Sequence, residues 1–434
     1  METEASLLIV LCGIALFSLF SGPIGRGSLT PPMVFTAFGL LLSPIGLGLI
    51  DISVDNGIIH AIAEITLILV LFTDAARINL KYLWAEHDIP IRLLLIGMPL
   101  SILAGALAAT TIFPELILLE ALILAIILAP TDAALGQVVV SSRHVPERIR
   151  QALNVESGLN DGIALPLLLF FASFAIANHG HEQQTDWLTF VTLQLVLGPL
   201  IGALLGWAGS KAINMAIERR FLSHEFCNIY LLTLAFIAYL AADLAGGNGF
   251  ISAFAAGVAT GNTLKKVNEE IYEFAESEGQ LLNLVVFFIF GAVLVPQVSG
   301  RMDMAIIGYA VLSLTLVRMI PTYLALIGKR LRIETVLFLG WFGPRGLASI
   351  LFVLLLLEHA QIAQDRLVLD TVIVTVTLSI FLHGVSALPG VRTYAAALQM
   401  CKQRGDDLSA EHQAVASMPL RQFSTGKPGD RGEK

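Results

Sequence analysis

A short run of polar residues lies in the middle of one long apolar segment of this chain. Glu156, Ser157, Asn160 and Asp161 occur in the sequence Glu-Ser-Gly-Leu-Asn-Asp-Gly, which ends at Gly162. An ionised side chain in a bilayer costs at least ~2.5–3.5 kcal/mol, so such residues in a membrane helix are candidates for a functional site. Positions four apart share a helix face, which groups Glu156 with Asn160 and Ser157 with Asp161. One pair can therefore have a structural role while the other pair faces an ion pathway.

Three more ionisable residues, Asp132, Arg318 and Arg345, fall inside apolar runs. At ~1.5 Å per helical residue, Asp132 and Asp161 each lie roughly 15 Å deep, near the middle of ~30 Å of hydrocarbon. The two arginines come out at a similar depth. The alternative to an ion site is a set of buried ion pairs, which is a poor source of stability. For Glu156 alone, we expect a structural pair with one of the arginines.

Two of the apolar runs contain proline and are expected to be interrupted. One reads Leu-Ala-Pro-Thr-Asp-Ala around Thr131, and the other reads Trp-Phe-Gly-Pro-Arg-Gly around Pro344. Proline removes a backbone donor and clashes with the preceding turn. Interrupted helices are a sequence indication of a transporter site, because their half-helix ends bind ions. Opposing helix ends need opposite charges, and Asp132 and Arg345 fit that need. The alternative is a pair of ordinary proline kinks.

The residues near these breaks supply hard oxygen atoms as ligands, namely Thr131, Asp132, Ser157, Asn160 and Asp161. Such oxygens suit Na⁺, Li⁺ or K⁺ and not transition metals. An apolar site also favours the neutral form of a carboxyl group. One Asp can then hold either a proton or a metal cation, and this competition predicts exchange of the two. We expect no cofactor and no nucleic-acid partner.

The elements that position these residues are membrane helices. The chain is 56% hydrophobic and 14% charged, with a mean hydropathy of +0.78, whereas soluble domains carry about 25% charged residues. About thirteen apolar runs are long enough to span a bilayer. They lie at 6–21, 30–50, 57–76, 91–113, 117–139, 150–178, 187–216, 225–243, 248–262, 279–299, 303–327, 334–357 and 366–390. The sequence therefore predicts an all-α polytopic membrane protein.

Basic residues predict the orientation. Nearly all basic loop residues follow odd-numbered runs, and the even-numbered loops hold only Arg301 and Arg366. Because Lys and Arg accumulate in cytoplasmic loops, we expect an inner-membrane protein with its N-terminus outside and its C-terminus in the cytoplasm. Residues 1–392 would form the membrane domain. Residues 393–434 would form a short polar tail, which we expect to be disordered.

Three motifs together resemble the NhaP/NHE branch of monovalent cation–proton antiporters. They are the Glu-Ser-Gly-Leu-Asn-Asp run, the Pro-Thr-Asp of one break and the Gly-Pro-Arg-Gly of the other. The resemblance covers about 6–390 and implies a thirteen-helix fold with NhaA-like inverted repeats and broken fifth and twelfth helices. It implies core helices at about 91–178 and 303–390, with the remaining spans as dimerisation scaffold. It also implies a homodimer that works by alternating access.

The resemblance also implies roles for individual residues. Asp161 would bind the ion or the proton, Asp132 would be its partner, and Thr131 (through its carbonyl) and Ser157 would be further Na⁺ ligands. Glu156 would pair with Arg318 and be held by Asn160, and Arg345 would compensate the broken-helix ends. The Asn-Asp pair implies electroneutral one-for-one exchange of Na⁺ or Li⁺ for H⁺. One departure concerns the first break, where Ala129 and Ala133 stand in place of the family's flanking Asp and Pro.

Alternative functions and two further residues stay open at this point. The nearest alternative is K⁺/H⁺ exchange by the same fold. A cation channel is a different class, for which no repeated filter is visible, and no enzyme motif is visible either. Glu64 lies in the run at 57–76 and is expected to be a hydrogen-bonded structural acid, with a transport role as the alternative. His383 is expected to be a satisfied helix contact, with pH sensing as the alternative.

Overall fold

A computed structural model describes most of the chain as a bundle of helices. It describes residues 2–24, 29–50, 57–78, 80, 88–132, 134–179, 184–264, 269–359 and 364–413. These residues form helices and connecting turns, without any strand. The predicted all-helical class is thereby confirmed. Ala133, one of the two positions that depart from the family pattern, lies outside the described residues.

The helices follow the chain in a simple order. They are α1 (Glu2–Ile24), α2 (Pro31–Leu42), α3 (Gly57–Ala76), α5 (Asp88–Arg92), α6 (Met98–Ile112), α7 (Leu118–Ile127), α8 (Gln137–Ser141), α9 (Glu147–His179), α10 (Gln184–Glu218), α11 (His224–Leu244), α12 (Gly249–Thr263), α13 (Glu269–Ile289), α14 (Val295–Val298), α15 (Met304–Leu314), α16 (Leu316–Leu326), α17 (Ile333–Trp341), α18 (Leu347–His359) and α19 (Asp365–Arg404). Two π-helical turns, η1 (Leu93–Gly97) and η2 (Phe290–Leu294), join α5 to α6 and α13 to α14.

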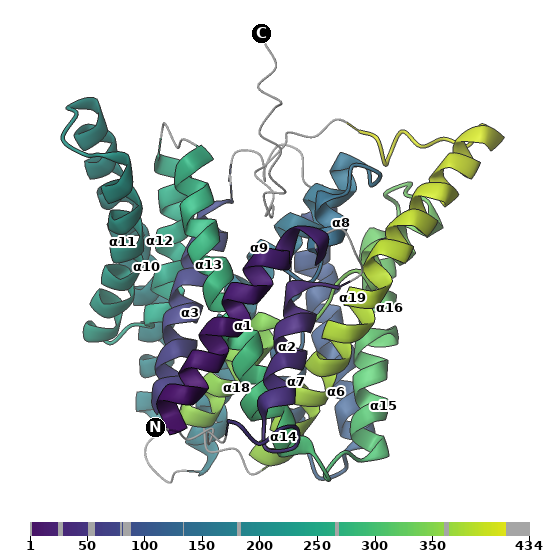
Figure 1. The fold of residues 1–434 in the computed structure, drawn as a ribbon, viewed down its shortest axis with the longest axis horizontal. Coiled ribbons are helices and arrows are strands. Elements are labelled where there is room, and N and C mark those ends of the chain that lie inside the picture. Colours follow the sequence, from purple (N-terminus) through teal and green to yellow (C-terminus); the bar gives the residue numbers. More distant parts are fainter. Residues whose placement is uncertain are drawn as a thin grey trace.

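The helices are those of a multi-pass membrane protein. Within the described residues, eight helical segments are long and apolar enough to cross a bilayer, and shorter apolar helices accompany them. Each apolar run of the sequence overlaps one helix, one helix with its π-turn, or a pair of half-helices. The number of thirteen crossings stays a prediction. The first residues of α1 and the last of α19 lie at opposite ends of the bundle (Figure 1).

The predicted breaks interrupt two helical rods near their middles. α7 ends at Ile127 and α8 begins at Gln137, whereas α17 ends at Trp341 and α18 begins at Leu347. The two irregular segments touch, since the backbone N–H of Asp132 donates to the carbonyl of Pro344 at 2.8 Å. Irregular backbone at membrane depth is tolerated only where protein buries it or where it lines a cavity. The two breaks satisfy each other in this way.

The half-helix that leads into the first break is buried. Ile123, Leu124, Ile126 and Ile127 of α7 are fully buried, so this half-helix is surrounded by protein.

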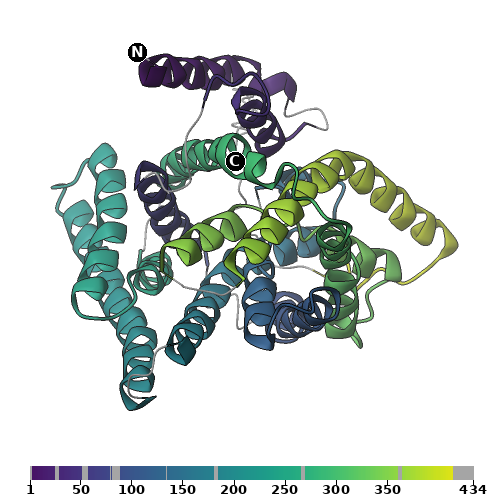
Figure 2. The same ribbon diagram turned by 90° about the horizontal axis from the view of Figure 1, so that it is seen from below.

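α10, α11 and α12 form a group at one side of the bundle (Figures 1 and 2). Gly202 lets α10 pack closely on α12, because it has no side chain; a Cβ atom added there would collide with the backbone of Ser252. Small residues at such contacts let membrane helices come together.

The C-terminal segment differs from the sequence prediction. Disorder was expected from 393 onward, but α19 continues to Arg404 and ends in a left-handed Gly405 with φ +78°. Glycine favours this helix-ending conformation. The following residues fold back, and Glu411 is fully buried. The prediction is therefore wrong for 393–413, because the polar residues there bind helix ends; 414–434 lie outside the described residues.

Candidate ion-binding site

Asp132 links the two breaks through its side chain. Its Oδ1 accepts the N–H of Ala134 at 2.7 Å, and its Oδ2 accepts the N–H of Leu347, the first residue of α18, at 2.8 Å. A helix N-terminus carries partial positive charge and unsatisfied N–H groups, so it stabilises an anion. Gly346 leaves room for this contact, since a side chain there would meet Oδ2 at 2.2 Å. Asp132 is therefore held as the cap of the opposite half-helix.

Arg345 makes the reverse connection. Its Nη1 donates to the carbonyl of Ala129 at 2.6 Å and to that of Pro130 at 3.3 Å, just beyond the C-terminal end of α7. The partial negative charge of a helix C-terminus favours a cation there. The backbone N–H of Arg345 donates to Ser379 Oγ at 2.6 Å, which fixes the break against α19. Arg345 is almost completely buried, with 1% exposure.

The polar run of α9 contacts the first break through Thr131. Ser157 Oγ donates to the carbonyl of Thr131 at 2.7 Å, and Asn160 Nδ2 donates to its hydroxyl at 2.7 Å. The resemblance implied that Asn160 holds Glu156, but the structure directs this amide to Thr131. The reason is rotational, since Asn160 lies between Glu156 and Ser157 around the helix at about 100° per residue. Thr131, Ser157 and Asn160 thus form one hydrogen-bonded unit.

Glu156 contacts Arg318, which resolves the choice between the two arginines. Arg318 Nη2 lies 2.6 Å from Glu156 Oε1, and both side chains are 3% exposed. The guanidinium of Arg318 passes directly over Gly343, where a side chain would meet its Nε at 2.6 Å. This ion pair therefore ties α9 to α16 and to the second break.

Asp161 lies on a different part of the α9 surface. It is half-buried, and around the helix it lies between Ser157 on one side and Gly158 and Gly162 on the other. A side chain at Gly162 would collide with the ring of Phe254 in α12, and one at Gly158 would lie 3.9 Å from the carbonyl of Asp74 in α3. Around the helix, Asp161 therefore falls between the side that binds Thr131 and the side that packs on α3 and α12.

A small pocket reaches Asp132. Its lining includes Thr131, Asp132 and Ser157, together with Gly136 and Val140 on the way to α8. α8 lies in the upper part of Figure 1, whereas α18 lies in the lower part. The pocket thus lies between the two breaks, α8 and α9.

Sequence reasoning missed two serines that complete the site. Ser349 Oγ donates to the carbonyl of Ile127 at 2.7 Å and so satisfies the end of α7. Ser379 accepts the N–H of Arg345, and its backbone carbonyl lies 3.0 Å from Nδ1 of the buried His383. A single serine in an apolar helix is a common residue, so the sequence contains no signal that marks either one. His383 contacts the site through Ser379 and through the ring of Trp341, the last residue of α17, at 5.1 Å between ring centroids.

Comparisons with known sequences agree on one protein family. A family model described as "Sodium/hydrogen exchanger, transmembrane" matches residues 7–392. The Na(+)/H(+) antiporter 2 of Zygosaccharomyces rouxii is 28% identical over 337 residues, which are 73% of this chain and 41% of that protein. The K(+)/H(+) antiporter NhaP of Alkalimonas amylolytica is 25% identical over 404 residues, or 92% of this chain and 68% of that protein. The chain thus spans less than half the length of the first of these relatives.

The fold matches solved structures as well. The sodium proton antiporter MjNhaP1 from Methanocaldococcus jannaschii at pH 8 superposes with a TM-score of 0.72 and 19% sequence identity, covering 88% of this chain and 100% of that chain. At this identity the likeness shows a shared fold. Together with the family match over 7–392, it establishes that the chain belongs to the sodium/hydrogen exchanger family of multi-pass membrane proteins.

Proposed function

We propose that the chain is a secondary transporter that exchanges Na⁺ or Li⁺ for H⁺, one for one, with the cation and the proton competing for Asp161. The observation that carries this proposal is the division of work between the two aspartates. Both oxygens of Asp132 accept backbone N–H groups. Hydrogen bonds of this kind favour the charged form of a carboxyl group. Asp132 therefore serves as a fixed anion, and Asp161 serves as the group that changes state.

The remaining ligands would come from the break beside Asp161. The Thr131 carbonyl and Ser157 Oγ lie 2.7 Å apart, so an ion that enters between them can use both oxygens. Ser157 and Asp161 share a helix face. Hard oxygen ligands of this kind suit a small monovalent cation. Asn160, Glu156, Arg318 and Arg345 would hold the frame around the ion.

Electroneutral exchange follows from the fixed charges. Glu156 and Arg318 form one ion pair, and Asp132 and Arg345 carry opposite charges at the crossing of the breaks. In this proposal Asp161 is the one carboxylate of the group that exchanges a proton for a cation. One proton or one Na⁺ neutralises it equally. A one-for-one exchanger moves no net charge and is insensitive to a membrane potential, which is worth ~2.3 kcal/mol per charge per 100 mV.

K⁺/H⁺ exchange is the second candidate. The relative that aligns with 92% of this chain is named a K(+)/H(+) antiporter. Oxygen ligands accept Na⁺ and K⁺ alike, and the distances within the site do not favour one of them. The ion series in the experiment below separates the two cations.

The rest of the transport cycle is part of the same proposal. The Asp132 pocket is lined in part by α8 and α9, and the basic Arg143, Arg148 and Arg150 lie in the loop between these helices or in the first turn of α9. The positive-inside rule assigns this end to the cytoplasm. We infer a homodimer in the inner membrane, in which the core helices move relative to the scaffold to expose the site alternately.

The test is ion exchange by the purified protein in proteoliposomes, followed with a pH-sensitive dye. Na⁺, Li⁺, K⁺ and Ca²⁺ are added in turn across a pH series, with and without an imposed potential. We expect proton movement with Na⁺ and Li⁺, none with Ca²⁺, and the same rate at either potential. Proton movement with K⁺ alone would establish the second candidate. A rate that follows the potential would overturn one-for-one exchange.

A further inference from the structure

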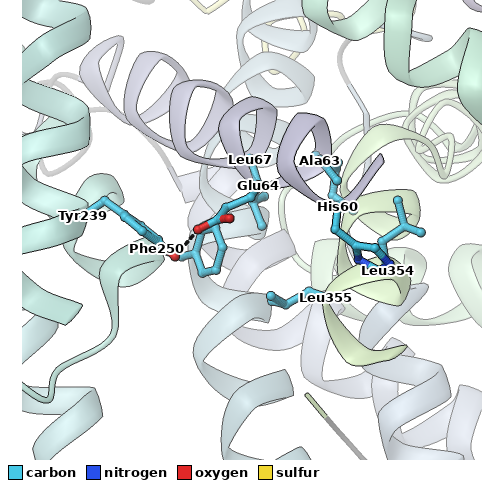
Figure 3. Close-up of a pocket in the computed structure, with 9 residues that line it drawn as sticks. His60, Ala63, Glu64, Leu67, Tyr239, Phe250, Leu354 and Leu355 are labelled. Carbon is cyan, nitrogen blue, oxygen red and sulfur yellow. Dashed lines mark hydrogen bonds between the residues drawn. The ribbon is translucent and has the colours of Figure 1, made fainter. Parts of the chain in front are cut away.

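A second pocket lies on the other side of the breaks from Asp132. It is formed by His60 and Glu64 of α3, Tyr239 of α11, Phe250 of α12 and three leucines of α18 (Figure 3). α18 starts at the break, and its pocket residues Leu351 and Leu355 follow one to two turns later. At ~1.5 Å per residue, they lie about 6 to 12 Å farther from Asp132 along the helix axis.

The two pockets share no lining residue and are separated by protein. The Asp132 pocket extends toward α8, whereas the second pocket lies between the first turns of α3 and the far half of α18. Ile350, Leu351 and Phe352 of α18 are at most 1% exposed. The second pocket therefore approaches the site from the opposite face without reaching it in this structure.

The polar groups of the second pocket converge on one carboxylate. Tyr239 Oη donates to Glu64 Oε1 at 2.5 Å, and the second carboxylate oxygen takes no part in this bond (Figure 3). His60 lies one helical turn before Glu64 and also faces the pocket. The volume of the pocket that the centres of water-sized spheres can reach is about 80 Å³. About 10–15 Å³ of such volume holds one water molecule, so a partly hydrated ion fits.

The charge of Glu64 requires a partner from solution. Glu64 is the eighth residue of α3, about 10 Å along the span, and its side chain is exposed. Among the described residues that line the pocket there is no Lys or Arg. A carboxylate at such depth is stable when water or a counter-charge reaches it. A proton, a protonated His60 or a dissolved cation can supply that charge.

We propose that Glu64 and Tyr239 form a monovalent-cation subsite that loads ions from the face opposite the Asp132 pocket. This inference rests on the proposed antiport function. The carboxylate attracts the cation, and the Tyr239 hydroxyl turns its oxygen toward the ion. The surrounding leucines keep the pocket from binding larger polar solutes. By the positive-inside rule this face is the outer one.

The experiment compares the two membrane faces separately. Na⁺-dependent proton movement is measured in right-side-out and inside-out vesicles at about pH 8, where an ordinary imidazole is neutral. Glu64→Gln is expected to raise the KM for Na⁺ about tenfold at the face that the pocket serves, since a charge contact at a wet surface is worth about that much. The KM at the other face is expected to stay unchanged.

Two further variants control for folding and for net charge. Tyr239→Phe keeps the carboxylate but removes the hydroxyl oxygen proposed to contact the cation, and it is expected to raise the same KM by about twofold to threefold, the low end of what one polar contact contributes. Asp243→Asn removes one charge one turn farther along α11, at an exposed position outside the pocket, and is expected to have no effect. Equal shifts at both faces, or no shift with Glu64→Gln, would overturn the subsite. Wild-type vesicles without Na⁺-driven proton movement would instead contradict the proposed function.

Discussion

Asp132 and Arg345 bind across the two broken helices in opposite directions. Asp132 follows α7 and accepts the N–H of Leu347 at the start of α18, while Arg345 precedes α18 and donates to Ala129 just after α7. Each charge therefore offsets the helix dipole of the other rod. The pair holds an irregular crossing at membrane depth, and Asp161, the proposed ion carrier, lies on the neighbouring α9.

Gly346 tests the contact between Asp132 and α18. A side chain there would meet Asp132 Oδ2 at 2.2 Å, so Gly346→Ala must displace the carboxylate or the helix start. We expect a loss of about 1–3 kcal/mol in stability, as when a buried donor is left unsatisfied, and a lowered melting temperature in detergent. Gly308→Ala in α15 is the control, because nothing lies within 4 Å of a side chain added there. An unchanged melting temperature for Gly346→Ala would contradict the capping role.

Substitutions of Glu156 and Arg318 test whether their ion pair has a structural role. Glu156→Gln leaves the buried Arg318 charge unpaired, and breaking a buried pair destabilises proteins by ~3–5 kcal/mol. The double variant Glu156→Leu with Arg318→Met removes both charges and is expected to recover most of the melting temperature. If the double variant is less stable than Glu156→Gln, the pair has a role other than holding α9 to α16.

Glu411 tests the C-terminal segment as a cap of α17. Its Oε1 accepts the N–H of Arg332 at 2.7 Å and the hydroxyl of Thr335 at 3.1 Å. Glu411→Ala removes the one oxygen that accepts both hydrogen bonds, at the start of the half-helix that leads to the second break. We expect a loss of about 1–3 kcal/mol, measured by thermal unfolding. Asp407→Asn, at an exposed position of the same segment, is the control and should unfold like the wild type. Equal melting temperatures for the two variants would exclude the cap.

Local sequence signals predicted the breaks. Pro130 and Pro344 favour an interruption of their helices, although Pro166 and Pro389 lie inside continuous helices. Depth counting placed Asp132, Asp161, Arg318 and Arg345 near the middle of the membrane. Counting residues did not separate Arg318 from Arg345 as the partner of Glu156, because it gives depth but not the rotation of each helix; the family resemblance implied Arg318, and the structure has that pair. The same limit explains Asn160, whose amide meets Thr131.

Local sequence signals did not predict the contacts between segments that lie far apart in the chain. Glu411 lies in a polar segment that reads as a tail, and its burial depends on α19 continuing to Arg404 and the chain then folding back. Glu64 was expected to be a hydrogen-bonded acid, and the Tyr239 bond agrees with that interpretation. The pocket beside it needs four helices to assemble, so no single stretch of sequence indicates it.

The most direct measurement is Na⁺-driven proton movement by Asp161→Asn in proteoliposomes, beside the wild type and Asp243→Asn. The account predicts that Asp161→Asn inserts and melts like the wild type, yet moves no more protons than liposomes without protein, because an amide can neither release a proton nor neutralise a cation. Asp243→Asn should exchange like the wild type. Na⁺-driven proton movement retained by folded Asp161→Asn would contradict the central claim.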